Sequence, residues 1–294
     1  MTSRRSFLKT SALVSAGFLV APQVFAYNKK YIGLQLYTVR DAMAHDPAGT
    51  LAKVAQIGYN SVEGATYTGD EKFYGMDTKT FSKLLKDNGL IMPSSHYRLG
   101  EEKMNGQDTQ GTLMHDWQKA VDDASEIGLK YMVCAWLSNS ERGNLDHFIK
   151  VAGELNKAGE VCKKSGIQLV YHNHDFEFIK EGDKYPYDAI MSHTDENLVK
   201  MEMDIYWLAK AKQDPIALIN QYPGRYPMWH IKDMNNKPDQ MFTEVGNGII
   251  DFKAIFKHAN KAGLKYYFVE QDVCPGSPFD SITQSINYIK KNLV

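Results

Sequence analysis

The stretch Ser165-Gly166-Ile167-Gln168-Leu169-Val170-Tyr171-His172-Asn173-His174 decides the fold of this chain. A segment with helical periodicity ends at Gly166, an apolar β-rich run follows at once, and that run ends in polar and ionisable residues. Glycine after a helix readily adopts the left-handed conformation that closes the last turn. The stretch therefore predicts a helix, a tight turn and a buried strand with ionisable side chains at its carboxyl end.

The same junction recurs along the chain, at Ile57-Gly58-Tyr59, Asn88-Gly89-Leu90, Ile127-Gly128-Leu129 and Ala262-Gly263-Leu264. Successive glycines of the five junctions are 31, 39, 38 and 97 residues apart, and the last gap has room for about three units of the same size. Asp46-Pro47, Asp77, Asp214-Pro215 and Ser277-Pro278 are typical helix starts. A βα period without repeated sequence predicts a parallel sheet covered by helices.

Eight strands are predicted, at Tyr31–Tyr37, Ser61–Ala65, Ile91–Ser95, Tyr131–Trp136, Gln168–Tyr171, Val199–Met203, Met228–Ile231 and Tyr266–Val269. Eight βα units of this length favour a (β/α)₈ TIM barrel over an open sheet. The first strand is also not followed by the glycine-rich phosphate loop that is frequent in open dinucleotide-binding sheets. We expect residues 27–294 to form a single catalytic barrel domain.

Residues 1–26 read as a secretory signal. Ser3-Arg4-Arg5-Ser6-Phe7-Leu8-Lys9 precedes an apolar run from Ser11 to Val20 and the small-residue cleavage pattern Val24-Phe25-Ala26. The paired arginines, with Phe7, Leu8 and Lys9, resemble a twin-arginine signal, which exports folded proteins; the alternative is an ordinary secretion signal that holds two arginines. The sequence thus predicts a periplasmic protein beginning at Tyr27.

Composition excludes several classes of protein. The chain is 43% hydrophobic and 12% aromatic, which is typical of a packed globular core. Removing residues 1–26, which carry three basic residues and no acid, changes the net charge from −1 to −4, and no basic stripe indicates nucleic-acid binding. No later apolar run approaches the ~20 residues of a membrane span. Cys134, Cys162 and Cys274 are expected to be free thiols.

Ionisable residues follow the predicted strands, and in a barrel of this type the active site lies at the carboxyl ends of the strands. Alone, each has an ordinary explanation: a hydrogen-bonded structural histidine, or a carboxylate that caps the next helix. The set converging on one mouth is harder to explain that way, because buried charges are costly without a common partner. A histidine of the fifth strand end, His172 or His174, would form a shell for one divalent metal such as Mn, Zn or Co with residues of the next three strands, Asp204, His230 and Glu270.

Lys232 lies two residues after His230 and should point to the same side of its strand. There it could stabilise a developing oxyanion, or simply pair with Asp233 or Glu202. Glu63 could orient a substrate hydroxyl or cap a helix. The remaining candidates for substrate contact, all near strand ends, are His96, Arg98, Trp136 and Trp207.

The ordered motifs resemble the sugar isomerase/epimerase superfamily with the xylose-isomerase-like barrel. They are Ile32–Asp41, Gly58–Glu63, Tyr171–Asp175, Glu202–Asp204, His230–Asp233, Val245–Phe252 and Val269-Glu270. The resemblance implies one divalent metal held by His172, Asp204, His230 and Glu270, and proton transfer next to a sugar carbonyl. Glu270 would contact both the metal and the substrate.

Two positions depart from the keto-sugar epimerases of that superfamily. Those enzymes have Glu where this chain has His172, and His where it has Trp207. A metal-bound imidazole cannot also act as a free base, so epimerisation by two opposed bases is disfavoured. His174 or Glu177 would serve as base beside Lys232, as in the dehydratase and lyase branches. Exported relatives of this kind are associated with breakdown of 3-keto-glycosides by β-elimination.

Two other functions remain open at this stage. The first is a metal hydrolase like the abasic-site endonucleases, which share the barrel but hold three metals and carry basic grooves; the net charge and the single ligand set argue against it. The second is a non-catalytic sugar-binding protein, which the intact ligand set disfavours. We expect a small carbohydrate ligand, no nucleic acid and no membrane span after cleavage; the sequence does not indicate the oligomeric state.

Overall fold

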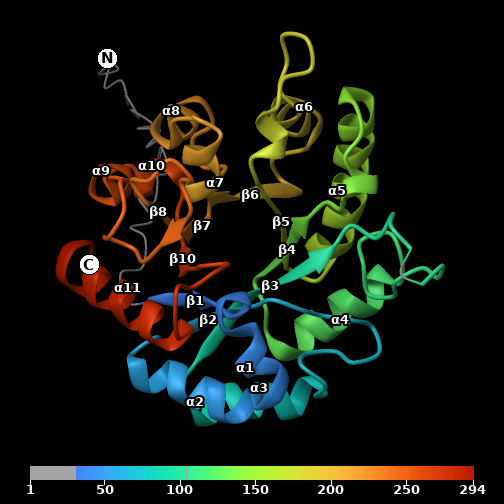
Figure 1. The fold of residues 1–294 in the computed structure, drawn as a ribbon. Coiled ribbons are helices and arrows are strands. Elements are labelled where there is room, and N and C mark those ends of the chain that lie inside the picture. The colour runs from blue at the N-terminus through green and yellow to red at the C-terminus, as the bar shows by residue number, and fades with distance from the viewer. Residues whose placement is uncertain (1–30, 104) are drawn as a thin grey trace, which may run out of the picture.

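The computed structural model describes residues 31–103 and 105–294, so the predicted signal at residues 1–26 lies outside the described residues. Eight parallel strands close into a barrel in the order β1-β10-β7-β6-β5-β4-β3-β2, with helices around it (Figure 1). The barrel strands are β1 (Gly33–Gln35), β2 (Ser61–Gly64), β3 (Ile91–Arg98), β4 (Tyr131–Trp136), β5 (Gln168–His172), β6 (Val199–Asp204), β7 (Met228–Ile231) and β10 (Tyr266–Val269). This confirms the predicted TIM barrel.

Several of the connecting helices begin or end at the residues that the sequence marks. They are α1 (Arg40–His45), α2 (Pro47–Ile57), α3 (Thr78–Asp87), α4 (Trp117–Ile127), α5 (Leu145–Lys164), α6 (Pro186–His193), α7 (Ile205–Lys210), α8 (Pro215–Gln221), α9 (Phe252–Phe256), α10 (Ala259–Ala262) and α11 (Pro278–Asn292). Asp46, Asp77 and Asp214 each accept a backbone N–H of the first helical turn. The glycine at each of the five junctions has a positive φ, as predicted.

Two strands differ from their predicted bounds by more than one residue at an end. β1 is only three residues long, because the Gln35 side chain accepts the amide of Tyr37 and a 3₁₀ helix (Leu36–Val39) begins at once. β3 extends through His96 to Arg98, so these two candidates lie within the strand. A short two-stranded sheet, β8 (Asp233–Met234) with β9 (Phe242–Thr243), was not predicted; it follows β7 directly.

The interior of the barrel is apolar at its base and ionisable above. A small cluster of apolar residues, separate from the main core, contains Val133, Ala135, Val170, Met228 and Phe268. Side chains two residues apart share one face of a strand, so the next inward residues after Val170, Met228 and Phe268 are His172, His230 and Glu270. The apolar base thus supports a layer of ionisable groups at the mouth.

Two glycines and two of the cysteines are explained by packing. A Cβ on Gly33 would meet the Phe268 ring and, at 2.6 Å, the Tyr267 carbonyl oxygen, so glycine permits the close approach of β1 to β10. Gly159 of α5 would similarly meet the Leu198 carbonyl at 2.8 Å.

The three cysteines are free, with Cys134 and Cys162 buried, in agreement with the prediction. In the described part of the chain, no helix combines the length and apolarity that a bilayer crossing demands.

Candidate active site

Pairs of ionisable residues at positions i and i+2 lie at the ends of four neighbouring strands, β5, β6, β7 and β10. They are His172 and His174, Glu202 and Asp204, His230 and Lys232, and Glu270 and Asp272. Because side chains two residues apart share one face of a strand, both members of each pair point to the same side. The carboxylates at this mouth form two tiers, a deeper one around Glu63 and Glu202 and a shallower one around Asp204 and Glu270.

Glu63 is the centre of the deeper tier and has no exposed surface. Its carboxylate accepts hydrogen bonds from Gln35 at 2.8 Å and Ser94 at 2.6 Å, and its Oε2 lies 2.6 Å from His230 Nε2. His96 Nε2 is 3.1 Å from the same oxygen. Glu63 is thus buried and held by four side chains of the barrel interior.

Glu202 is the second buried carboxylate of the deeper tier, and it also has no exposed surface. Its Oε2 lies 2.9 Å from His172 Nδ1 and 3.4 Å from His96 Nε2. Its Oε1 is 3.3 Å from His230 Nε2, but no described residue donates a hydrogen bond to it. Three imidazoles therefore surround one carboxylate.

Asp204 and Glu270 form the shallower tier with Lys232. The Lys232 ammonium lies 3.1 Å from Asp204, 2.7 Å from Glu270 and 2.9 Å from Asp272, and only 1% of its side chain is exposed. His230 Nδ1 is 2.9 Å from Glu270 Oε2. Lys232 thus pairs with three carboxylates, none of them the Asp233 or Glu202 considered from the sequence.

Asp233 turns away from the mouth. Its carboxylate accepts the backbone N–H groups of Gly246, Gly248, Met234 and Ile250 at 2.8 to 3.2 Å. It therefore fixes the segment between β9 and α9 against β8. A Cβ on Gly248 would collide with this carboxylate and with the Met234 carbonyl oxygen. Position 248 therefore requires glycine for the segment to lie this close to β8.

Neighbouring charges set the protonation of the groups most deeply buried. Burial would raise the pKa of Glu270, but Lys232 and His230 hold it well below its ordinary value. Burial would lower the pKa of Lys232, but Asp204, Asp272 and Glu270 raise it well above its usual range. Burial would also lower the pKa of His96, and the charge of Glu63 raises it to about 9. Glu270 is thus a carboxylate, and Lys232 an ammonium.

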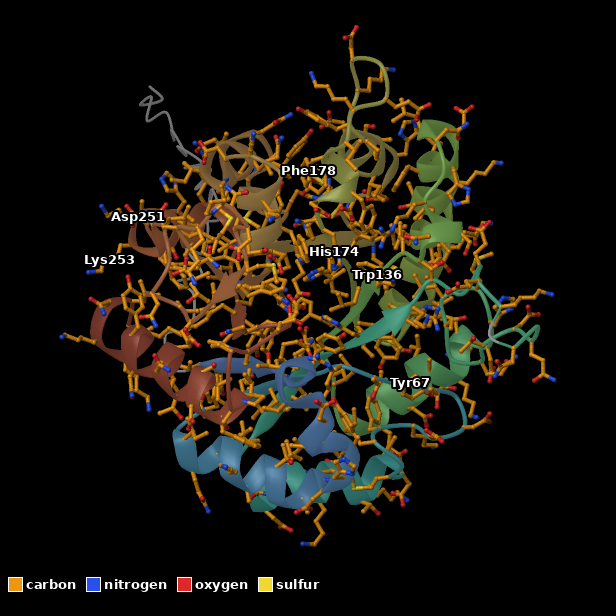
Figure 2. All side chains as sticks on the ribbon, viewed as in Figure 1. Tyr67, Trp136, His174, Phe178, Asp251 and Lys253 are labelled. Atoms are coloured by element: carbon orange, nitrogen blue, oxygen red, sulfur yellow. The ribbon has the colours of Figure 1, made fainter. Side chains whose placement is uncertain are left out.

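His174 differs from these groups because burial, reinforced by the Lys232 charge, lowers its pKa well below the usual value. Its imidazole is therefore neutral, and its Nδ1 has no hydrogen-bond partner among residues 31–103 and 105–294. Trp136 packs edge-on against it with ring centroids 4.7 Å apart (Figure 2). The Trp207 ring lies on it with centroids 5.4 Å apart. His174 is thus an available proton acceptor between two aromatic walls.

Two predicted site residues, Glu177 and Arg98, do not join the two tiers at the barrel mouth. Glu177 is fully buried and accepts hydrogen bonds from the Tyr171 hydroxyl at 2.7 Å and the His174 amide at 2.8 Å. Tyr171 faces the outer core, so Glu177 anchors the loop after β5 and has no open path to a substrate. Arg98 pairs with Glu102 at 2.7 Å, at the partly exposed rim.

The donor set fits a divalent metal. Asp204, His230 and Glu270 offer ligand atoms within 4.8 Å of one another, as do His96, His172, Glu202 and His230. Of the predicted ligands, His172 belongs to the second group, and its Nε2 lies 3.6 Å from Asp204 Oδ2. That oxygen is buried and lies 3.1 Å from the Lys232 ammonium and 4.0 Å from His230 Nδ1. Carboxylate oxygens and imidazole nitrogens that converge in this way are ligands suited to a divalent cation.

Glu202 and Asp272 are functional candidates that the sequence reasoning passed over. The signal was present: each stands two residues from a chosen residue on the same strand end, Glu202 before Asp204 and Asp272 after Glu270. Applying the strand period to every candidate, as was done for Lys232, would have found both. Gln35, which donates to Glu63, carried no such signal because a lone glutamine on a short strand is unremarkable in sequence.

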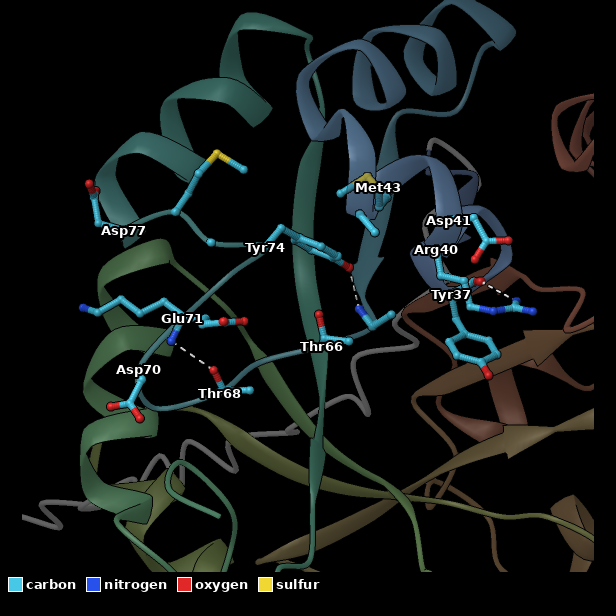
Figure 3. Close-up of a pocket in the computed structure, with 15 residues that line it drawn as sticks. Tyr37, Arg40, Asp41, Met43, Thr66, Thr68, Asp70, Glu71, Tyr74 and Asp77 are labelled. Carbon is cyan, nitrogen blue, oxygen red and sulfur yellow. Dashed lines mark hydrogen bonds between the residues drawn. The ribbon is translucent and has the colours of Figure 1, made fainter. Parts of the chain in front are cut away.

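A separate cavity of about 1080 Å³ lies beside the mouth (Figure 3). Residues of the segment from β1 into α1 and of the loop between β2 and α3 line it, among them Tyr37, Arg40, Thr68 and Tyr74. Arg40 also donates to the Asp272 carbonyl at 3.0 Å, so one wall of the cavity adjoins the strand end that carries Asp272. None of the imidazoles of the two tiers lines this cavity.

Comparison with known proteins identifies the family. The model of the xylose isomerase-like TIM barrel family matches residues 51–292. The chain belongs to this family. It is 30% identical to an inosose dehydratase of Clostridium beijerinckii, over 58% of this chain and 67% of that protein. It is 25% identical to an inosose dehydratase of Geobacillus thermodenitrificans, over 74% and 82% of the two chains.

Solved structures agree. A sugar phosphate isomerase/epimerase from Parabacteroides distasonis is 29% identical, with a TM-score of 0.75 over 90% of this chain and 95% of that one. Two more distant structures share the fold at TM-scores of 0.68: the IolI protein, 13% identical, holds a zinc atom, and a Mycobacterium smegmatis protein, 16% identical, holds magnesium. They cover 90% and 91% of this chain, and 99% and 98% of their own. The chain is therefore an enzyme of the isomerase, epimerase or lyase type.

Proposed function

We propose that this chain is a divalent-metal-dependent lyase that removes a proton next to a sugar carbonyl and expels the β-substituent. The observation that carries the proposal is the imidazole of His174, whose Nδ1 has no hydrogen-bond partner among the described residues, at the same mouth as the Lys232 ammonium and the ligand residues. The dehydratase relatives support an elimination, since loss of water is a β-elimination. His172 and Trp207 replace the residues of a two-base epimerase, which favours chemistry on one face of the substrate.

His172, Asp204, His230 and Glu270 would hold the metal, with Mn, Zn or Co suited to mixed nitrogen and oxygen ligands. A bound divalent ion would polarise the carbonyl and stabilise the negative charge that develops on its oxygen. The two tiers contain five carboxyl groups, Glu63, Glu202, Asp204, Glu270 and Asp272, which outnumber the Lys232 ammonium and the two imidazoles with raised pKa values, His96 and His230. A cation is therefore electrostatically favoured at this mouth.

The residues of the chain would divide the proton transfer among them. His174 Nδ1 takes the proton α to the carbonyl, and the C–H electron pair becomes the new double bond. The β-substituent leaves with the electron pair of its C–O bond and can receive the same proton from His174. Lys232 would stabilise the oxyanion electrostatically, and Trp136 and Trp207 would pack against the sugar ring and exclude water.

The substrate proposed here is a keto-sugar, either a 3-keto-glycoside or a keto-cyclitol such as an inosose. Both have an acidic C–H beside a carbonyl and a leaving oxygen at the next carbon. Periplasmic localisation, which residues 1–26 suggest, would favour a 3-keto-glycoside over a phosphorylated sugar.

The test is turnover of both substrate types in D₂O by metal-loaded enzyme, followed by NMR. We expect solvent deuterium at the α carbon and release of the β-substituent. Glu270→Gln and His174→Gln should each lower kcat by about 10²-fold or more while substrate still binds. A product that retains its original α hydrogen, with Glu270→Gln still active, would indicate a hydrolase. Tight binding without turnover or exchange would indicate a sugar-binding protein.

A further inference from the structure

We infer that Glu63 and Glu202 are positioning residues that orient the two metal-binding imidazoles, His230 and His172, from beneath. This inference rests on the proposed metal centre and adds a second tier to it. It assigns to two fully buried carboxylates a role that neither substrate contact nor direct metal ligation supplies.

His230 faces a different tier with each of its ring nitrogens. Nδ1 lies 2.9 Å from Glu270 and 4.0 Å from Asp204, which are both proposed ligands. Nε2 lies 2.6 Å from Glu63. A metal uses the lone pair of one nitrogen, so the other nitrogen carries the proton and donates it. With a metal among Asp204, Glu270 and Nδ1, the proton of His230 lies on Nε2 and is donated to Glu63.

His172 repeats this arrangement with the nitrogens exchanged. Its Nε2 is 3.6 Å from Asp204 Oδ2, on the side of the ligands, and its Nδ1 is 2.9 Å from Glu202 Oε2. The proton of His172 therefore lies on Nδ1 and is donated to Glu202. Two imidazoles on different strands each thus have one nitrogen toward the ligands and one toward a buried carboxylate.

The two carboxylates are themselves held in place. Ser94 and Gln35 donate to Glu63, and His96 lies within 3.4 Å of an oxygen of both Glu63 and Glu202. Neither carboxylate has exposed surface, so a substrate at the mouth does not reach them. Carboxylates that accept the second N–H of a metal-bound histidine fix its tautomer and ring orientation, and losing one typically weakens metal binding by about 10- to 100-fold.

The competing arrangement is a second ion in the deeper tier. His96, His172, Glu202 and His230 also offer ligand atoms within 4.8 Å of one another. A second ion there would occupy His230 Nε2 and His172 Nδ1, the nitrogens that the positioning role requires to carry protons. The two arrangements therefore predict different metal stoichiometries and different histidine tautomers.

The experiment measures zinc affinity and zinc per chain for purified wild type, Glu63→Gln, Glu202→Gln and Asp204→Asn. Glu244→Gln is the matched control, since Glu244 is a buried carboxylate that bonds Ser281 outside the mouth. We expect one zinc per chain in the wild type, Kd raised about 10- to 100-fold in Glu63→Gln and Glu202→Gln, and no change in Glu244→Gln. Asp204→Asn should lose most of its zinc.

Each other outcome has a distinct meaning. An unchanged Kd in both Glu63→Gln and Glu202→Gln, with zinc lost from Asp204→Asn, overturns the positioning role and leaves the proposed function intact. Two zinc ions in the wild type, one of them lost in Glu202→Gln, overturns it in favour of a second ion. Zinc retained by Asp204→Asn contradicts the proposed metal centre itself.

A measurement on the unmutated protein keeps the test independent of folding defects. In zinc-loaded wild type, long-range ¹H–¹⁵N correlation spectra report which nitrogen of each imidazole carries the proton. We expect His230 to be protonated at Nε2 and His172 at Nδ1. Protons found on the opposite nitrogens, or on neither, would overturn the inference.

Discussion

Lys232 is the residue whose environment is least expected for a metal centre. Its ammonium already neutralises Asp204 and Glu270, two of the proposed ligands, and Asp272 as well. A divalent ion and this ammonium therefore compete for the same carboxylates and repel each other. On the mechanism proposed above, Lys232 would weaken metal binding while it places a positive charge beside the reacting carbonyl.

We predict that Lys232→Met binds metal at least as tightly as the wild type but loses most of its kcat. Removing the ammonium leaves three carboxylates unpaired, so the metal-free variant should be less stable, and added metal should raise its melting temperature by more than it does in the wild type. Calorimetric melting with and without zinc, together with a chelator competition, measures both effects. Weaker metal binding in Lys232→Met would show that the ammonium supports the site.

Among the elements, the loop after β5 contains Glu177, a candidate base that the structure shows in a structural role. Glu177 lies five residues after His172, near enough in sequence to be considered for catalysis. Burial raises its pKa to about 7, although hydrogen bonds from Tyr171 and from the amides of Glu177 and His174 act in the opposite direction. The loop therefore carries a carboxyl group that is protonated more readily than usual and that holds the backbone of His174.

We predict that Glu177→Gln is more stable than the wild type above pH 7 and similar to it near pH 4.5. Because the folded-state pKa is raised, the stability contributed by this group is fully present below its unfolded pKa and is lost as pH rises through about 7. Glutamine resembles the protonated acid and does not titrate, so the variant keeps its stability as the pH rises through about 7. With each pKa unit equivalent to about 1.4 kcal/mol, the difference at pH 8 should be of order 1–3 kcal/mol. Urea unfolding at pH 5 and pH 8 measures it; equal stability differences at the two pH values would contradict the assignment.

At the scale of the whole molecule, the sequence was sufficient for the barrel. Gly166 and the other four junction glycines mark five helix ends, and apolar runs mark all eight strands, because helix closure and strand burial are local effects. The two tiers were harder to predict. Which nitrogen of His230 meets Glu63 depends on strands that are 167 residues apart in sequence, and barrel closure alone brings them together.

The same limit explains the substrate candidates. Arg98 and Trp136 both lie near strand ends, but one is paired with Glu102 at the rim and the other packs on His174. A register shift in the pairing of β3 with β4 lies between Tyr97 and Arg98, beside both of these candidates. An irregularity of this kind has no signal in hydrophobic periodicity, so the sequence could name the candidates but could not separate them.

Export is a property of the whole molecule, and it would join residues 1–26 to the metal site. We propose that the twin-arginine signal directs export of the folded, metal-loaded enzyme to the periplasm. The metal would then be bound in the cytoplasm, so the ions available there determine which one the enzyme holds. We predict that Arg4→Lys with Arg5→Lys leaves a folded, metal-containing precursor in the cytoplasm, since the change keeps both positive charges and removes only the paired guanidinium groups. Cell fractionation with a cytoplasmic marker, followed by elemental analysis of the retained protein, measures both parts. Normal periplasmic recovery of the double variant would exclude the twin-arginine route, and a retained precursor without metal would show that the ion is acquired after export.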